Sequence, residues 1–353
     1  MTKYKIFIDT SIQKERFELL IKYSLKYNIL NDNNIELVEK YEKSDLIIFL
    51  VNSGNNLLNL DNKYNYLFET NIPIILLERQ DSAITWCRET HKIKNLKAIF
   101  KNRILKDTKL QNTNNTYYGK YQYFLVKDII SSDNIEIIDN SSDLGIKYYK
   151  KNNKLLEIPL DFLNNIKAIL WDFHSSPLCD HKSLSMKYFR NNNIDFKKNY
   201  DIFCINQIKS NNLVNEPRQK AKKIVQSLSN KYNVITNNLK KEEYEKIFSK
   251  SKVCVACWGF GEWVHMDAYA MYAGVILIKP NTDHVLMYPD IYKSDEIYIS
   301  CKHDFSDLKE VIENTLQNYN KYIPMLIKNR EMLMNIDEKK CCELFWKQII
   351  EYL

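Results

Sequence analysis

Apolar residues in the N-terminal part of the chain alternate between short continuous runs and segments with helical spacing. The runs, which predict buried strands, are Tyr4–Asp9, Ile35–Val38, Leu46–Val51, Ile72–Leu77 and Leu96–Phe100. Helical patterns lie between them at Lys14–Tyr27, Tyr64–Glu69 and Ser82–His91. Continuous apolar strands separated by helices are typical of a parallel sheet covered on both faces. We therefore predict a doubly wound α/β domain over residues 1–170, regular at first and less so after Phe100.

The same alternation returns after a polar stretch. Between Trp171 and Asn199 the periodicity fades around Pro177 and an Asn run, which predicts a linker over residues 171–198. The next predicted strands are Asp201–Ile205, Val234–Thr236, Val253–Cys257, Val275–Ile278 and Glu296–Ile299. Helices are predicted at Glu216–Lys231, with Pro217 in the first turn, and at Lys241–Ser249, Glu262–Gly274, Asp304–Gln317, Lys321–Met334 and Glu338–Tyr352. Residues 199–335 are thus predicted to form a second α/β domain.

Two Rossmann-like, doubly wound domains in series are expected to face each other across a cleft. In each, the loops at the carboxyl ends of the strands would hold the ligands. The apolar final helix, residues 336–353, carries Phe345, Trp346 and Ile349 and is predicted to cross back to the first domain.

One strand–loop–helix–strand unit, residues 251–292, points to a ligand. The buried strand runs into the small-residue loop Trp258-Gly259-Phe260-Gly261, and Glu262 then opens the predicted helix, which ends at Gly274. A second apolar strand delivers Lys279. This arrangement sets backbone N–H groups and a helix N-terminus at one edge of a sheet, where open α/β folds hold phosphates. The expected ligand is of the nucleotide type.

Composition changes this picture little. A chain of 353 residues with 45% hydrophobic residues suffices for two cores. The net charge of +7 comes from 51 basic and 44 acidic residues that are interspersed. This balance suits a phosphate-bearing ligand or solubility and is weaker than the concentrated basic face of a nucleic-acid binder. Nucleic acid is therefore not expected as a partner, and the oligomeric state stays open.

The cysteines and the N-terminal sequence indicate a reducing compartment. Eight Cys form no regular framework. Cys254 and Cys257 would face opposite sides of a strand, so buried thiols are favoured over a metal site. The start, MTKYKIFIDT, lacks a secretory apolar region, and no apolar run reaches the about 18 residues of a membrane span. We expect a cytoplasmic protein, in the host cytoplasm if the source is viral, without metal or resident cofactor.

The residues from Trp258 to Asp267, then Ala270 to Gly274, Leu277 to Pro280, and His284 to Tyr292 resemble the donor-binding half of glycosyltransferases with the GT-B fold. The likeness is greatest to the exostosin-like and the bacterial or viral cell-surface types. It covers residues 200–292 well, whereas the N-terminal half matches only as general architecture. The resemblance implies two Rossmann-like domains, with the acceptor bound by the first and a nucleotide-sugar donor by the second.

The chain departs from the family pattern at one position. Many relatives carry a Glu five residues before the Gly that ends this helix, where it holds the nucleotide ribose. Here that position is Tyr269, so a Tyr hydroxyl or Asp267 would have to make the ribose contact. The pair of glutamates that is typical of many retaining members is also absent, which leaves inversion or retention of configuration open.

The resemblance implies roles for further residues. The leaving diphosphate would be held by the N–H groups of Gly259–Gly261 and by Arg218 and Lys279, fixed cations that replace a divalent metal. Glu262 and His265 are spaced i, i+3 and would bind donor hydroxyls or phosphate. Trp258 and His284 complete the predicted donor site. For Arg218 a solvated first-turn position, and for His284 loop packing, are the alternatives.

The acceptor-side base is expected in the loop after the buried strand that ends at Leu77. Asp81 is our choice for the general base that accepts the acceptor proton, with Glu78 second and Asp9 as a further candidate. Asp81 also precedes Ser82 at a helix start, where an N-cap role would explain it.

We thus expect a metal-independent hexosyl- or pentosyltransferase that moves a sugar from a nucleotide diphosphate to a glycan or glycoprotein. Two alternatives remain: a sugar-nucleotide epimerase of the same fold, and a binding module that has lost the chemistry. Transfer to a DNA base would require strongly salt-dependent binding, which the modest charge does not indicate.

Overall fold

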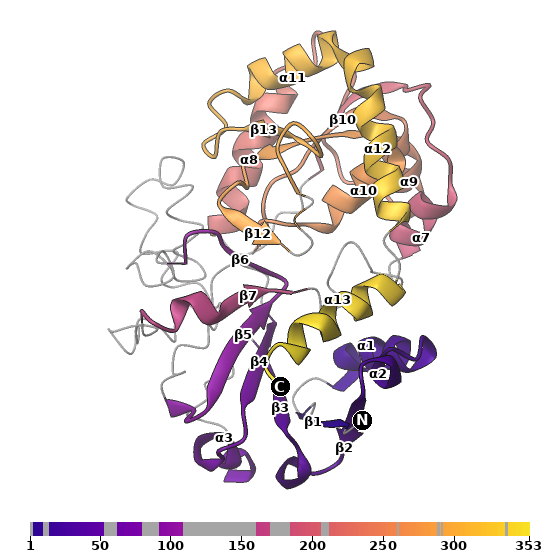
Figure 1. Cartoon of the computed structure of the whole chain (residues 1–353). Coiled ribbons are helices and arrows are strands. Elements are labelled where there is room, and N and C mark those ends of the chain that lie inside the picture. Colours follow the sequence, from indigo (N-terminus) through magenta and orange to yellow (C-terminus); the bar gives the residue numbers. More distant parts are fainter. Residues whose placement is uncertain are drawn as a thin grey trace.

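The computed structural model describes residues 3–9, 14–52, 62–79, 92–108, 160–169, 184–205, 212–259, 261–287, 290, 292–335 and 338–353. These residues form two α/β units, each built on one parallel sheet (Figure 1). The indigo-to-magenta unit comes from the N-terminal half of the chain, and the orange unit from the C-terminal half. The predicted fold class, two doubly wound Rossmann-like domains, is confirmed.

The N-terminal sheet has the order β2-β1-β3-β4-β5-β7, and every pairing in it is parallel. Its strands are β1 (Tyr4–Asp9), β2 (Ile35–Val38), β3 (Leu46–Asn52), β4 (Ile74–Arg79), β5 (Leu96–Lys101) and β7 (Ile166–Ala168). The helices of this unit are α1 (Lys14–Lys26), α2 (Ile29–Asp32) and α3 (Tyr66–Glu69). Successive residues of β3 face opposite cores: Ile48 packs with α1, while Ile47 packs with α3. Both faces of the sheet are thus covered, as continuous apolar strands require.

The C-terminal sheet is also parallel, in the order β13-β11-β10-β8-β9. Its strands are β8 (Tyr200–Phe203), β9 (Val234–Ile235), β10 (Ser251–Val255), β11 (Ile276–Pro280) and β13 (Ile299–Cys301). The helices are α7 (Leu184–Asn191), α8 (Asn212–Gln226), α9 (Lys241–Ser249), α10 (His265–Ala273), α11 (Leu308–Gln317) and α12 (Ile323–Met334). Helices α8 and α11 cover one face, and α7, α9 and α10 cover the other.

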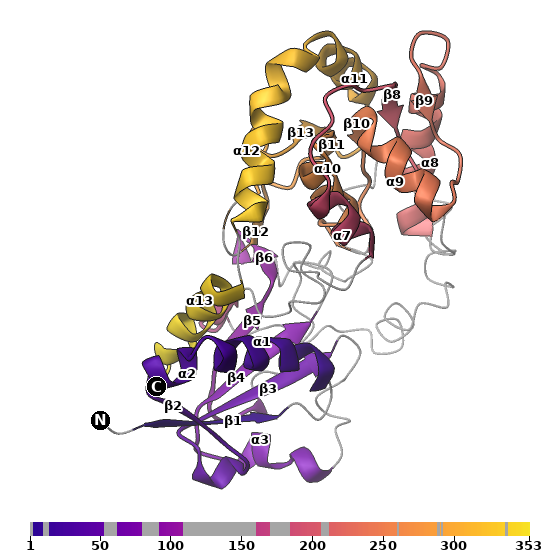
Figure 2. The same cartoon turned by 90° about the vertical axis from the view of Figure 1, so that its right-hand side faces the viewer.

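Within the part of the chain that the structure describes, two elements join the units. Strand β6 (Arg103–Leu105) follows the N-terminal sheet and pairs antiparallel with β12 (Val285–Met287) of the C-terminal unit. Helix α13 (Glu338–Ile350) returns from the C-terminal unit and lies against α1, as both views show (Figures 1 and 2). Trp346 is fully buried there, and its indole N–H donates to Ser24 Oγ at 2.8 Å. The predicted return of the last helix to the first domain is confirmed.

Some predicted boundaries were wrong. The helix expected from Glu262 begins at His265, because Val264 at its N-cap is extended (φ −129°, ψ 156°). Helix α8 begins at Asn212, so Pro217 lies inside it and not in its first turn. The strand expected at Glu296–Ile299 is shifted to β13, and the turn before it contains Asp295 with φ 62°.

The second half of the expected linker is structured. Residues 184–191 form α7, which packs on α10 and α9. The chain after it is held to the C-terminal unit, where Lys198 Nζ donates to Ser249 O at 2.8 Å. Arg330 on α12 donates to the carbonyl oxygens of Phe189 and Tyr272, near the C-termini of α7 and α10. The polar residues around α7 hid its helical periodicity, so the sequence predicted a linker where the structure has a short helix.

Candidate functional site

The order of the C-terminal sheet places a topological switch point between β8 and β10. Counted within the unit, β9-β8-β10-β11-β13 is the order second, first, third, fourth, fifth, a doubly wound arrangement. The chain leaves β8 for α8 on one face and leaves β10 for α10 on the other. Ligands of such sheets bind outside the carboxyl ends of the strands at this switch point. The connections that follow β8 and β10 therefore frame the candidate site.

Arg218 and the glycine loop meet at this switch point. A Cβ added to Gly259 would lie 3.6 Å from Arg218 Nη2, so the guanidinium of α8 sits directly beside the loop after β10. Cys257 Sγ donates to Pro217 O at 3.9 Å, which ties the two connections together. Burial lowers the pKa of Arg218, a cost that a bound anion would offset. The Gly259 N–H donates to Gly261 O at 3.2 Å.

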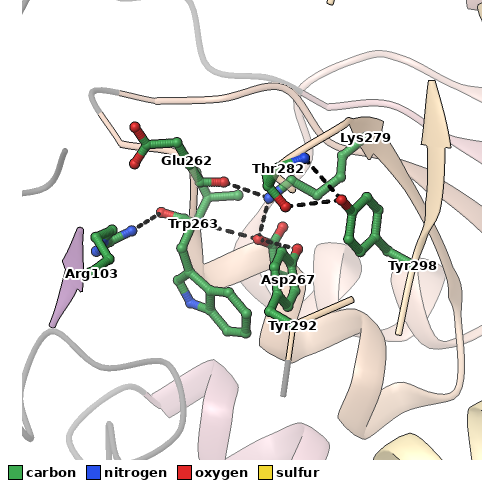
Figure 3. Close-up of polar contacts among 9 residues, drawn as sticks. Arg103, Glu262, Trp263, Asp267, Lys279, Thr282, Tyr292 and Tyr298 are labelled. Atoms are coloured by element: carbon green, nitrogen blue, oxygen red, sulfur yellow. Dashed lines mark hydrogen bonds and ion pairs between the residues drawn. The ribbon is translucent and has the colours of Figure 1, made fainter. Parts of the chain in front are cut away.

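Lys279 and Asp267 form a fully buried ion pair behind this loop (Figure 3). Lys279 Nζ lies 2.6 Å from Asp267 Oδ2 and donates to Glu262 O at 2.5 Å. The same carboxylate oxygen accepts from Tyr292 OH at 2.8 Å and from Val264 N at 3.3 Å. Burial lowers the pKa of Lys279 and the Asp267 carboxylate opposes this, while burial raises the pKa of Tyr292.

This network positions backbone and does not present the charged groups of Lys279 and Asp267 to a ligand. Neither Lys279 nor Asp267 has exposed surface. The peptide plane fixes N–H opposite to C=O, so a Glu262 carbonyl directed at Lys279 turns the Trp263 N–H away from it. The carbonyl of Trp263 accepts in turn from Arg103 Nη1 at 3.5 Å. The sequence predicted that Lys279 lies at the end of a buried strand, and it does. The structure shows that its ammonium group contacts Asp267 and the carbonyl of Glu262.

Three aromatic rings gather where β10, β11 and β13 end. Trp258 follows β10, His284 follows β11 and His303 follows β13, with ring centroids 5.8 Å apart for Trp258–His284 and 5.2 Å for Trp258–His303. His303 Nε2 lies 2.8 Å from Asn281 O. Burial, with His303 as the second cause, lowers the pKa of His284 to about 3, so its imidazole is uncharged at neutral pH. Sequence reasoning missed His303, although it follows the third of three neighbouring strands.

His265 and Tyr269 lie on a different side of α10. The Tyr269 ring packs on Phe189 of α7 at 5.1 Å, and the exposed His265 stacks one turn earlier at 6.4 Å. These contacts face α7, whereas Arg218 belongs to α8 on the opposite face of the sheet. Glu262 is 3% exposed and precedes the helix, so it does not share a helical face with His265.

The candidate bases of the N-terminal unit have different surroundings. Asp81 lies outside the described residues. Glu78, near the end of β4, pairs with Lys101 Nζ at 3.1 Å, and both side chains are buried. Asp9 ends β1 at the β1–β3 switch point of its own sheet and accepts from Tyr66 OH at 2.6 Å. Burial and this hydrogen bond raise the pKa of Tyr66.

A hollow lies where the two units meet. It contains about 240 Å³ of empty space, open solvent included, and its lining is Arg103, Glu262, Trp263, Thr282, Val285, Met287 and Tyr292. Arg103 comes from β6 of the N-terminal unit and the others from the C-terminal unit. We call this the interdomain hollow.

Two further surveys concern the described residues only. Within them, no group of three or more His, Cys, Asp or Glu side chains is arranged to hold a metal ion. No helix among them combines the length and the apolar character needed to cross a bilayer. The cysteines of β10 and the following loop are buried and unpaired by disulfides, with Cys254 in one core and Cys257 in the other.

Comparison with known proteins finds only weak similarities to solved structures. No protein-family model matches the chain, and no curated protein matches it in sequence. Among solved structures, an α1,3-fucosyltransferase with GDP is similar over 99% of this chain and 91% of its own, with 16% identity and a TM-score of 0.40. The glycotransferase of kitacinnamycin is similar over 99% of both chains, with 9% identity and a TM-score of 0.35. The catalytic domain of starch synthase IV from Arabidopsis thaliana, bound to ADP and acarbose, covers 96% of this chain and 77% of its own, with 12% identity and a TM-score of 0.31. Likeness at this level does not assign a function.

Proposed function

We propose that this protein is a glycosyltransferase of the GT-B architecture that uses a nucleotide diphosphate sugar. The observation that carries the proposal is the placement of Arg218 beside Gly259 at the switch point of the C-terminal sheet. A glycine there lets a diphosphate approach the backbone, and a guanidinium binds phosphate oxygens through two parallel hydrogen bonds.

The chemistry follows from the same placement. As the glycosidic bond to the diphosphate breaks, negative charge grows on the leaving oxygens, and a preorganised cation lowers the energy of that state. In the proposed reaction Arg218 does this without a divalent metal. Lys279 and Asp267 act indirectly. They hydrogen-bond to the carbonyl of Glu262 and the N–H of Val264, and so fix the loop in place.

The acceptor side is assigned to the N-terminal unit. A glycan or glycoprotein hydroxyl would lose its proton to Asp81, or to Asp9, which lies at the switch point of that sheet. Glu78 is the weaker choice because it is ion-paired with Lys101 and both side chains are buried. The sugar transferred would be a hexose or a pentose.

The first test is nucleotide binding. The melting temperature of the protein would be measured with UDP, GDP, dTDP, CMP and their sugars, with and without EDTA. A ligand at 100 times its dissociation constant stabilises by about 2.7 kcal/mol, which is readily seen. We expect one base to be selected, a shift that survives EDTA, and its loss in Arg218→Gln.

The control for Arg218→Gln is Lys309→Gln, which removes an exposed positive charge from α11 and should keep the shift. A folded wild-type protein that responds to no nucleotide would contradict the proposal. A transferase should release the nucleotide diphosphate from its sugar only when an acceptor is present. An epimerase needs no acceptor, so this dependence separates the two. Nucleotide binding without any turnover would indicate the binding module.

A further inference from the structure

The pairing of β6 with β12 connects the two units through main-chain hydrogen bonds. Figures 1 and 2 show these strands side by side between the two sheets. The ladder extends one residue past β6, where the N–H of Lys106 donates to the carbonyl oxygen of His284 at 2.9 Å. We call residues 103–106 and 284–287 together the interdomain joint. His284 is therefore part of the contact between the units through its backbone.

The side chain of His284 packs into the C-terminal unit. Its ring centroid lies 5.8 Å from that of Trp258, which follows β10, and 5.9 Å from that of His303, which follows β13. The imidazole is thus enclosed by residues at the carboxyl end of the C-terminal sheet. One residue holds the joint by its backbone and the C-terminal unit by its ring.

The backbone on both sides of His284 is fixed. The N–H of Val285 donates to the carbonyl oxygen of Thr282 at 3.0 Å, which closes a turn around His284. The N–H of Thr282 donates in turn to the hydroxyl of Tyr298 at 2.9 Å. Because the turn, the strand pairing and the ring packing share these few residues, the ring cannot leave its place without disturbing the start of β12.

A positive charge on the His284 ring is poorly accommodated in this place. Burial is the main cause that disfavours the charge, and the imidazole of His303 is the second. Lys106 and Lys279 also oppose it, whereas Asp283 favours it. Asp283 is exposed, and its carboxylate already accepts from an amide side chain at 2.8 Å, so it compensates the charge weakly. A charged ring is therefore stable only where water reaches it, outside the closed joint.

We propose that the interdomain joint is a pH-sensitive switch, in which a proton on His284 drives its ring out of the contact with Trp258 and His303 and separates β12 from β6. Each unit keeps its own sheet, and α13 is then the described connection that remains between them. The proton thereby regulates how the two units face each other. This inference needs no ligand and does not depend on the proposed function.

The direction and size of the effect follow from the two states of His284. Its pKa is lowered to about 3 in the closed joint, against 6.5 for an ordinary histidine. The closed joint is thus most stable above about pH 6.5, and opening becomes easier as the pH falls towards 3. Between pH 7 and pH 5 the ratio of open to closed joint should rise roughly 25-fold.

Hydrogen exchange of the full chain at pH 7 and pH 5 tests this, with rates corrected for the direct effect of pH on the exchange chemistry. Amides of the joint should exchange through a local opening that is more frequent than unfolding of either sheet, and this opening should rise roughly 25-fold at pH 5. Helix α3, at the end of the N-terminal unit away from the joint (Figure 1), is the internal control and its local opening should not respond.

His284→Gln cannot gain a proton and should lose the rise, whereas the exposed His265→Gln should keep it. If the joint opens no more often than β3 and β10, it opens only when the protein unfolds, and the inference is overturned. An unchanged opening of the joint between pH 7 and pH 5, or an equal rise in His284→Gln, overturns it as well. If the melting temperature shows that His284→Gln does not fold, the wild-type protein decides, because it compares the joint with α3 in one molecule.

Discussion

At the scale of single residues, breaking the ion pair of Lys279 and Asp267 should strongly lower the free energy of unfolding. Both side chains are fully buried, and Asp267 also accepts from Tyr292 and Val264. We predict that Lys279→Met lowers the free energy of unfolding by about 3–5 kcal/mol, because it leaves a buried carboxylate uncompensated. Urea denaturation measures this value.

The double variant Lys279→Met/Asp267→Asn removes both charges and should recover part of that loss. Lys231→Met is the control, since Lys231 pairs with Glu313 at the surface and its loss should change stability little. A Lys279→Met protein as stable as the wild type would show that the pair contributes nothing.

His284 predicts a pH dependence of stability. Its pKa is lowered from 6.5 to about 3 by burial, so between these values the unfolded chain binds a proton that the folded protein does not. Folding stability therefore falls as the pH drops from about 6.5 towards 3. His284→Gln should flatten the fall in unfolding free energy between pH 7 and pH 5. The exposed His265→Gln serves as control, and an unchanged slope in His284→Gln would contradict the assignment.

Residue spacing and the family resemblance together predicted which positions gather at the sheet edge but not what each side chain contacts. Arg218 and Gly259 were both predicted for the donor site, and the structure brings them together. Lys279 was predicted at the same edge, yet its partner depends on Asp267 being turned inward, and that depends on where α10 begins. Arg103 was missed, since strand β6 is three residues long and its pairing with β12 is a contact between distant parts of the chain.

At the scale of elements, two glycines in one β–α–β unit have opposite requirements. Gly274 ends α10 with φ 60°, and a Cβ there would lie 2.4 Å from Ile194 Cγ2. At Gly259 a Cβ would meet Arg218 and Val264 at an ordinary 3.6 Å. Gly274→Ala should thus cost at least about 1–2 kcal/mol of stability for the left-handed conformation alone. Gly259→Ala should fold normally but weaken nucleotide binding by about tenfold, because the methyl group occupies space at Arg218.

Thermal unfolding and nucleotide titration of the two variants check this contrast. If Gly259→Ala binds nucleotide as the wild type does, the diphosphate does not approach that backbone. If Gly274→Ala keeps full stability, Ile194 and the turn adjust more readily than the geometry implies.

Helix boundaries were the least predictable feature at this scale. The strand β10 and the helix α9 were anticipated to within two residues, because their apolar spacing is continuous. The start of α10 was misplaced, since the carbonyls of Glu262 and Trp263 accept from Lys279 and Arg103, side chains distant in the sequence. Tertiary contacts, and not local propensity, set that boundary.

At the scale of the whole molecule, the sheets of both units begin with the same strand order. The periodicity of the apolar runs was enough to predict the fold class, a doubly wound α/β domain in each half. Counted within each unit, the order begins second, first, third, fourth in both sheets. The relative placement of the units was not predictable beyond the return of α13, because it depends on the β6–β12 pairing and on the contact of Arg103 with Trp263.

The return of α13 makes the last residues of the chain part of the first unit. Trp346 is fully buried against α1, and Phe345 packs on Phe17 at 5.9 Å. Trp346→Ala should cost about 3–5 kcal/mol, as large-to-small changes in cores do. Ser24→Ala removes the acceptor of the indole N–H, together with a hydroxyl that donates to Leu20 O at 2.7 Å, and should cost about 1–3 kcal/mol.

Hydrogen exchange locates the effect of Trp346→Ala. Protection should fall in α1 and α2, which α13 contacts, and persist in α8 and α11, which belong to the other unit. Helix α13 follows α12 of the C-terminal unit and packs on the N-terminal unit, so it is one of the two described connections between the units. If α13 is released, the β6–β12 pairing is the described connection that remains. A uniform loss of protection across both units would instead show that they unfold as one cooperative body, with α13 stabilising the whole chain and not the first unit alone.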